Sequence, residues 1–154
     1  MKYISGMICF GIPCREDSVG TWLYTKQDYT DPDNLKLYES DDSIFKDLGI
    51  EQDKIIPYHD DGELFNVANH TRAYLDMLAN CEFDKLRDVF YDYISSKHCR
   101  YVIFRETYTR LSKLDTYKDI HKFMSEEFGN AWMSFCTDAL QVRRRVENAE
   151  CVST

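Results

Sequence analysis

A short polar segment, residues 66–72, contains the densest group of side chains that could bind a ligand. Its spacing predicts that Asn66, Asn69, His70 and Arg72 lie in the first turns of a helix, with Asn66 as the cap. Free amides and the positive end of the helix dipole favour an anion there. We therefore predict an anion or ligand site at these four residues. Ordinary helix capping, with His70 hydrogen-bonded inside the protein, explains the same pattern, and the sequence leaves both interpretations open.

Cys14 is the residue that could supply a nucleophile, since it lies in a predicted turn. A thiolate at neutral pH needs a cation or a helix start beside it. Arg15 offers a positive charge, but Glu16 opposes it, and no pattern brings His59 or His70 to the thiol. We therefore predict no catalytic residue, and a small enzyme that uses His70 or Cys14 remains an alternative.

Metal and cofactor motifs are missing from the sequence. The six cysteines include no Cys-x-x-Cys pair, and there is no glycine-rich phosphate loop. The pairs Asp41–Asp42 and Asp60–Asp61 could bind a hard divalent cation, but they lack the alternating spacing of a calcium loop. We predict no metal, no cofactor and reduced thiols.

Negative charge is concentrated in one part of the chain. Residues 28–63 carry 12 carboxylates against three lysines, a net charge of −9, whereas residues 67–154 have no net charge. Such a block repels nucleic acid and anionic membranes, and it attracts a basic protein surface. A solvated loop that keeps the protein in solution is the alternative. The predicted partner-binding residues are the acidic Asp28, Asp31, Asp33, Asp41, Asp42, Asp60, Asp61 and Glu63, with Tyr29, Tyr38 and Tyr58 as aromatic anchors.

The hydrophobic pattern predicts an α+β fold and a single domain of 154 residues. A small acidic, β-rich half (residues 1–65) is expected to pack on a helical half (residues 66–150) of four or five short helices. In the first half we expect one bent strand or two short strands at residues 2–12 and a strand at 21–25 (with Trp22). We also expect a short edge strand or extended piece at 54–58 and one helical turn at 43–48.

Helical periodicity dominates after Asn66. Residues 99–114 also contain a β-branched and aromatic run, but the helical period persists longer and favours a helix. Thr116 and Asp119 fit a capping box, and Gly129 is expected to end that helix before a last one begins at Asn130. Apolar runs are far too short to span a bilayer, so we expect a soluble, cytoplasmic protein.

Three segments resemble an uncharacterised group of small proteins from integrative elements and phages of Gram-positive bacteria. They are Met1–Cys14 (MKYISGMICFGIPC), Ser43–Ile50 and Asn66–Leu75 (NVANHTRAYL). The resemblance extends to about Trp132. Because the group has no assigned activity, no catalytic residue is carried over. The resemblance implies a mobile-element setting, often concerned with host defence or counter-defence.

The predicted function is a non-catalytic, acidic protein-binding module. Its partner would be a protein with a basic surface, such as a nucleic-acid-binding nuclease of host defence. The carboxylates would mimic phosphates and inhibit this partner in the manner of anti-CRISPR proteins. We expect no direct contact with nucleic acid or membrane, and a homodimer is compatible with the sequence. The alternative is an accessory or antitoxin-like subunit of a small mobile-element operon, which buries aromatic helix faces on a partner.

Overall fold

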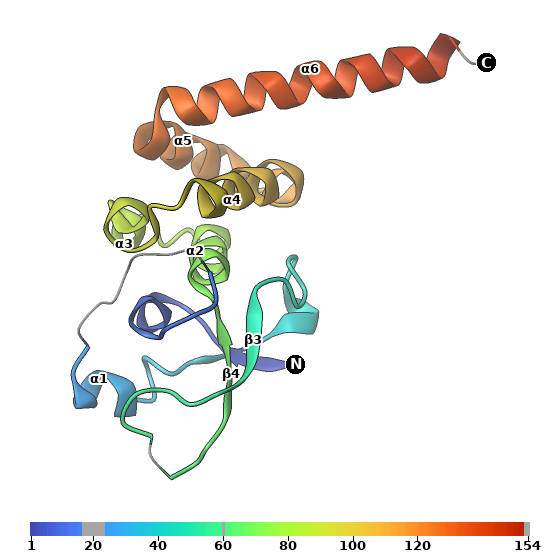
Figure 1. Ribbon diagram of the computed structural model, residues 1–154. Coiled ribbons are helices and arrows are strands. Elements are labelled where there is room, and N and C mark those ends of the chain that lie inside the picture. Colours follow the sequence, from blue (N-terminus) through green and yellow to red (C-terminus); the bar gives the residue numbers. More distant parts are fainter. Residues whose placement is uncertain (17–23, 60, 153–154) are drawn as a thin grey trace.

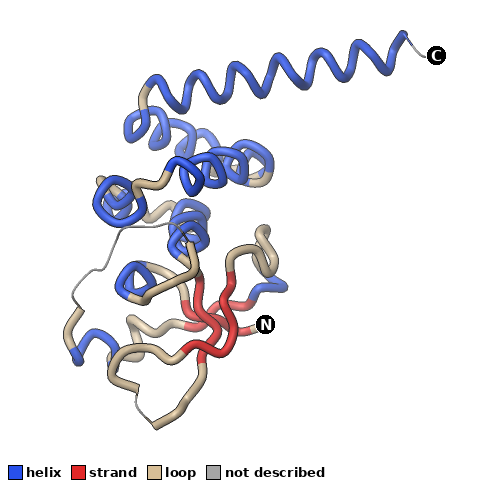
Figure 2. Tube along the Cα trace, in the orientation of Figure 1, coloured by secondary structure: helices blue, strands red, loops and turns tan. Residues whose placement is uncertain are grey.

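The computed structural model describes residues 1–16, 24–59 and 61–152, with the backbone alone for residues 149–152. The fold is α+β, as predicted: a four-stranded mixed sheet in the N-terminal half and helices in the C-terminal half (Figures 1 and 2). The elements are β1 (Lys2–Ile4), the 3-10 helix η1 (Met7–Gly11), α1 (Lys26–Thr30), β2 (Leu37–Glu39), the 3-10 helix η2 (Ser40–Asp42), β3 (Ile50–Lys54), β4 (Phe65–Ala68), α2 (His70–Ala79), α3 (Phe83–Leu86), the π-helix η3 (Phe90–Ile94), α4 (Lys97–Thr109), the 3-10 helix η4 (Leu111–Lys113), α5 (Tyr117–Phe128) and α6 (Asn130–Val152).

The sheet has the strand order β2-β1-β4-β3, so β1 and β4 form its centre. These two strands are parallel, with Ile4 opposite Val67, and both edge strands are antiparallel to their neighbours. Tyr3, Ile4 and Val67 are all buried, and the Tyr3 hydroxyl donates to Asp76 of α2 at 2.9 Å, which joins β1 to this helix. The centre of the sheet therefore holds α2 in place.

The predicted strand at residues 2–12 is much shorter than expected. Gly6 has φ +96°, a conformation that side-chain-bearing residues rarely adopt, and the chain leaves the sheet there to form η1. The expected helical turn at 43–48 consists of turns without a helix, and the expected strand at 54–58 ends at Lys54. Of the expected strand at 21–25, Thr21–Leu23 lie outside the described residues, and Thr25 caps α1 instead.

The boundary predicted at residue 66 cuts through β4. Asn66 lies in this strand rather than at the helix start, and its side-chain amide donates to the Lys2 carbonyl at 2.9 Å. Asn69 caps α2. The strand continues to Ala68 because its side chains fill the space beside β1, a tertiary effect that helical periodicity alone does not reveal.

Helix α2 lies at the centre of the molecule. Figure 1 shows it between the sheet on one side and the layer of α3 and α4 on the other. Every side chain from His70 to Leu78 is buried, which is the pattern of a helix covered on all sides. Residues at its N-terminus therefore contact both halves of the protein.

The C-terminal helices partly match the prediction. Helix α4 confirms a helix over most of residues 99–114, and Gly129, at φ +52°, ends α5. Thr116 precedes α5 but makes no capping hydrogen bond through its side chain. Helix α6 is 23 residues long rather than short, and its second half extends away from the body (Figure 1). None of the described helices is long and apolar enough to cross a bilayer.

Candidate functional site

Arg72, one of the predicted anion ligands, is completely buried. Its Nε donates to Asp76 Oδ1 at 2.8 Å, and this ion pair lies within α2. The remaining guanidinium hydrogens also have acceptors: the carbonyls of Lys46 and Leu48 at 2.6 Å each, the Tyr3 hydroxyl at 2.7 Å and Ser43 Oγ at 3.0 Å. Arg72 has five N–H donors, and all five are used. It therefore holds β1 and the 43–48 turn against α2 and has no donor left for a ligand.

The N-terminus of α2 is already capped by the protein's own groups. Asn69 Oδ1 accepts from the Arg72 amide at 2.8 Å, and Glu16 Oε2 accepts from the Thr71 amide at 2.9 Å. A carboxylate at this position is favoured by the helix dipole. The predicted site of Asn66, Asn69, His70 and Arg72 is thus not an open anion site. The capping interpretation fits the geometry, and Glu16, which sequence reasoning did not select, takes the anion's place.

The structure places Cys14 close to the start of α2, which the sequence did not predict: Glu16 Oε2 accepts from the Cys14 thiol at 4.0 Å and from the amide of Thr71, the residue after His70, at 2.9 Å. His70 is 2% exposed, and its Nε2 donates to the Ile12 carbonyl at 3.0 Å. In the described part of the chain, its Nδ1 is buried without a nitrogen or oxygen partner. Burial lowers the pKa of His70, but the Cys14 thiol, the Ile12 carbonyl and Glu16 raise the pKa by more, so that it lies above its ordinary value.

A cleft of about 470 Å³ opens beside this cluster. Its lining includes Arg15, Glu16 and Thr71, which are sequence neighbours of Cys14 and His70, together with His98 and Arg105 from α4. Glu16 Oε2 lies 4.0 Å from Cys14 Sγ. Neither Cys14 nor His70 is among its described lining residues, so the cleft adjoins the cluster through Arg15, Glu16 and Thr71.

The predicted acidic residues do not gather on one side of the protein. One group surrounds α1, because the loop after β3 packs on it: His59 Nε2 donates to the Tyr29 carbonyl at 2.8 Å. Another group lies at the N-terminus, where the Met1 amine is 3.5 Å from a Glu39 oxygen and 3.6 Å from an Asp41 oxygen. In Figure 1 the N-terminus and α1 are on opposite sides of the sheet. The predicted acidic residues therefore lie in at least two separate places on the protein.

The predicted residues divide between these places. Asp28 and Asp31 belong to α1 and its C-cap, and Asp61 and Glu63 belong to the loop. Asp33 lies in the exposed turn after α1, Asp41 and Asp42 lie in η2, and Asp60 is outside the described residues. We call the side chains of Asp28, Asp31, Ile55, Tyr58, Asp61, Glu63 and Leu64 the α1–loop surface; the two aspartates of α1 and its C-cap are half-buried, and the loop side chains are exposed.

The three predicted tyrosine anchors have different environments. Tyr29 is buried, and its hydroxyl donates to the Gly11 carbonyl at 2.9 Å, so it cannot serve as a surface anchor. Tyr38 is half-buried beside Tyr3. Tyr58 is 51% exposed and its ring contacts Tyr29, with the centroids 5.7 Å apart. Tyr58 is thus the predicted anchor that the structure leaves most accessible.

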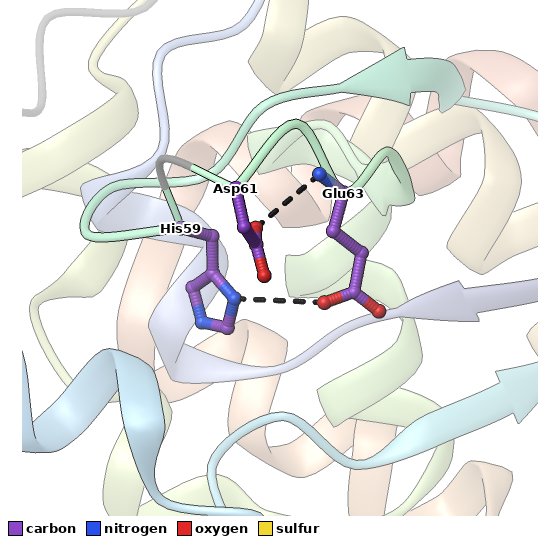
Figure 3. Close-up of side chains that lie close together, drawn as sticks. All are labelled: His59, Asp61 and Glu63. Carbon is purple, nitrogen blue, oxygen red and sulfur yellow. Dashed lines mark hydrogen bonds and ion pairs between the residues drawn. The ribbon is translucent and has the colours of Figure 1, made fainter.

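His59, Asp61 and Glu63 point toward one another in the loop (Figure 3). Their donor atoms all lie within 4.8 Å of one another, and His59 Nδ1 is 3.9 Å from Glu63 Oε2. Because Nε2 of His59 donates to a carbonyl, the Nδ1 lone pair of the neutral ring faces the two carboxylates. Such a group can share a divalent cation with water or hold a protonated imidazole. The alternation of these three residues along the chain is a sequence signal for such a cluster.

Comparisons with protein-family models, with curated proteins and with solved structures found no match.

Proposed function

We propose that this protein is a non-catalytic module that binds a basic surface of another protein through the α1–loop surface. The observation that carries the proposal is the composition of the loop after β3. Three large apolar side chains are exposed within ten residues: Ile55 at 63%, Tyr58 at 51% and Leu64 at 54%. Carboxylates of Asp61 and Glu63 stand among them.

This combination suits recognition of a cationic protein surface. Aromatic and aliphatic side chains that lose water on binding supply most of the affinity at an interface, and surrounding charges steer the encounter. Lys54, the nearest lysine in the sequence, forms an ion pair with Glu51 on β3 at 2.9 Å. Among the described residues, the four carboxylates of the α1–loop surface form no ion pair with a lysine or arginine; they are Asp28, Asp31, Asp61 and Glu63. Their negative charge is therefore available to a partner.

The biological setting forms part of the proposal. Carboxylates that occupy a groove made for phosphates would inhibit a nucleic-acid-binding protein, such as a nuclease of host defence, in the cytoplasm. This reading agrees with the mobile-element setting that the sequence resemblance implies.

A nona-arginine peptide provides a defined cationic probe. We expect the peptide to shift the backbone amide signals of α1 and the loop, as measured by NMR on the full chain. The test variant changes Asp28, Asp31 and Asp61 to Asn and Glu63 to Gln. The control variant changes Asp41, Asp42 and Asp47 to Asn and Glu39 to Gln, which removes the same charge elsewhere.

The two variants should differ clearly. Binding should weaken at least fivefold in the test variant and less than twofold in the control, because only the first group belongs to the α1–loop surface. Equal losses in both variants would mean that the peptide responds only to net charge, and the proposed surface would be rejected.

A second candidate function, the accessory subunit, is favoured by α6. Val142 and Val146 are more than half exposed, and they continue the 3,4 spacing of the packed residues Trp132, Phe135 and Ala139. This repeat is typical of a helix that pairs with another helix. The stripe thus extends beyond the part that α4 and α5 cover.

Truncation tests this candidate. If the stripe serves a partner subunit, a chain ending at Leu140 should lose a salt-insensitive complex with that subunit, measured by size-exclusion chromatography with light scattering. The stability of the remaining chain should change by less than about 1 kcal/mol, because the side chains of residues 141–148 are exposed. A complex that forms equally well without residues 141–154 would exclude this role.

A further inference from the structure

The strongest unassigned arrangement is the cluster at the N-terminus of α2. It comprises a half-buried thiol, Cys14, and a buried imidazole, His70, beside an open cleft. The proposed binding surface uses neither residue. A cysteine alone would not define a site, but here an imidazole nitrogen is buried without a nitrogen or oxygen partner in the described part of the chain.

The orientation of His70 follows from its hydrogen bond. Nε2 donates to the Ile12 carbonyl at 3.0 Å, so the proton of the neutral ring is on Nε2. Nδ1 consequently carries a lone pair and is available as a base. The Ile12 carbonyl also belongs to the segment that continues into Cys14, so one short stretch of chain positions the thiol and orients the imidazole.

Phe10, Glu16 and Cys99 are neighbours of this pair that the described residues provide. The Phe10 ring of η1 lies 5.7 Å from the His70 ring, measured between centroids. Glu16 follows Cys14 in the chain, and its Oε2 is 4.0 Å from Cys14 Sγ. Cys99 contributes a second, fully buried thiol from α4. Glu16 disfavours a thiolate and favours an imidazolium, so its net effect on an ion pair is small.

We propose that Cys14 and His70 form a thiolate–imidazolium pair that makes Cys14 the reactive thiol of this protein toward small, soft electrophiles that enter the adjacent cleft. The thiol proton moves to His70 Nδ1, and the thiolate attacks the electrophile. The raised pKa of His70, to which the Cys14 thiol contributes, agrees with this pairing. The inference is independent of the proposed binding function.

Iodoacetamide is a suitable probe. The sulfur of Cys14 forms a bond to the methylene carbon, the carbon–iodine bond breaks, and iodide leaves with the bonding electrons while the proton stays on His70. At pH 6 the thiolate fraction of an ordinary cysteine is very small. We therefore expect Cys14 to be alkylated about tenfold faster than Cys81. The larger thiolate fraction of Cys14 should outweigh the lower intrinsic nucleophilicity of a thiolate whose pKa is depressed.

The experiment uses the reduced, full-length chain and mass spectrometry of its peptides. Cys81 and Cys136, which are also half-buried, serve as internal controls in the same tube. In His70→Gln, the side-chain amide can still donate to the Ile12 carbonyl but offers no base. The rate at Cys14 should then fall about tenfold at pH 6, whereas the rate at Cys81 should stay unchanged.

A second measurement covers the case in which His70→Gln does not fold. The imidazole of His70 is titrated by NMR in the native sequence and in Cys14→Ser. The pKa of His70 should be lower in Cys14→Ser, because the thiol is one of the groups that raise it. An unchanged titration, or alkylation of Cys14 no faster than that of Cys81, would overturn the proposal.

Discussion

Arg72 and His70 lie two residues apart on α2, and both are buried, but their polar atoms are satisfied to different degrees. Arg72 has acceptors for all five of its N–H groups. His70 uses one ring nitrogen for the Ile12 carbonyl and keeps the other as a potential base. A fully paired side chain stabilises a fold, whereas an unpaired buried nitrogen costs free energy and is more typical of a chemical role.

Arg72→Lys should destabilise the protein by about 3–5 kcal/mol, since breaking a buried charged network leaves carbonyl and hydroxyl acceptors unpaired and removes the guanidinium donor from Asp76 Oδ1. Lysine has three donors and lacks the planar arrangement that reaches Tyr3, Ser43 and two carbonyls together. Urea denaturation measures the loss, and Arg143→Lys on the exposed part of α6 is the control. A loss below about 1 kcal/mol would show that the network contributes little.

The stability contributed by His70 should depend on pH. Its pKa is raised in the folded state, so the protonated ring stabilises the fold fully below its ordinary pKa of about 6.5. This contribution is lost as the pH rises through the higher folded-state pKa. The difference in unfolding free energy between the native sequence and His70→Gln should therefore shrink from pH 6 to pH 8. A difference that grows over this range would contradict the assigned cause.

At the scale of elements, the sequence predicts long periodic helices better than short strands. The apolar repeat of α4 and the glycine after α5 were sufficient to predict those helices. Strands of three residues, such as β1 and β2, carry too short a pattern, and their pairing depends on distant segments. For the same reason Glu16 at the start of α2 was not predicted, because 55 positions separate it from Thr71. The Arg72–Asp76 pair, four residues apart on one helix, did carry a local signal.

The turn before β3 requires glycine for two separable reasons. Gly49 has φ +70°, and a Cβ there would lie 2.7 Å from Asn69 Oδ1 and 2.8 Å from Arg72 Cβ. Gly62 has φ +81° but nothing within 4 Å. Gly62→Ala should therefore cost about 1 kcal/mol from backbone strain alone, and Gly49→Ala roughly 3 kcal/mol from strain and overlap. Equal thermal shifts for the two variants would show that the overlap is relieved without cost.

For the whole molecule, the composition shows that the negative charge is concentrated in the N-terminal half of the chain. It does not show how those charges are arranged in the folded protein. The sheet places α1 with its loop and the N-terminus with η2 on different sides. Local charge density along a chain cannot reveal this separation, because it depends on strand order. The surface that remains for binding is smaller than expected, yet it contains exposed apolar side chains that charge counting did not identify.

The most direct test of the proposed binding function is the salt dependence of nona-arginine binding, measured by calorimetry at several concentrations of sodium chloride. For the native sequence, affinity should fall steeply as salt rises, because attraction between exposed charges is screened. In the test variant (Asp28, Asp31, Asp61 and Glu63), the slope of log affinity against log salt should become shallower by about half. In the control variant (Glu39, Asp41, Asp42 and Asp47), the slope should stay close to that of the native sequence. Equal slopes in the two variants would contradict the assignment of binding to the α1–loop surface.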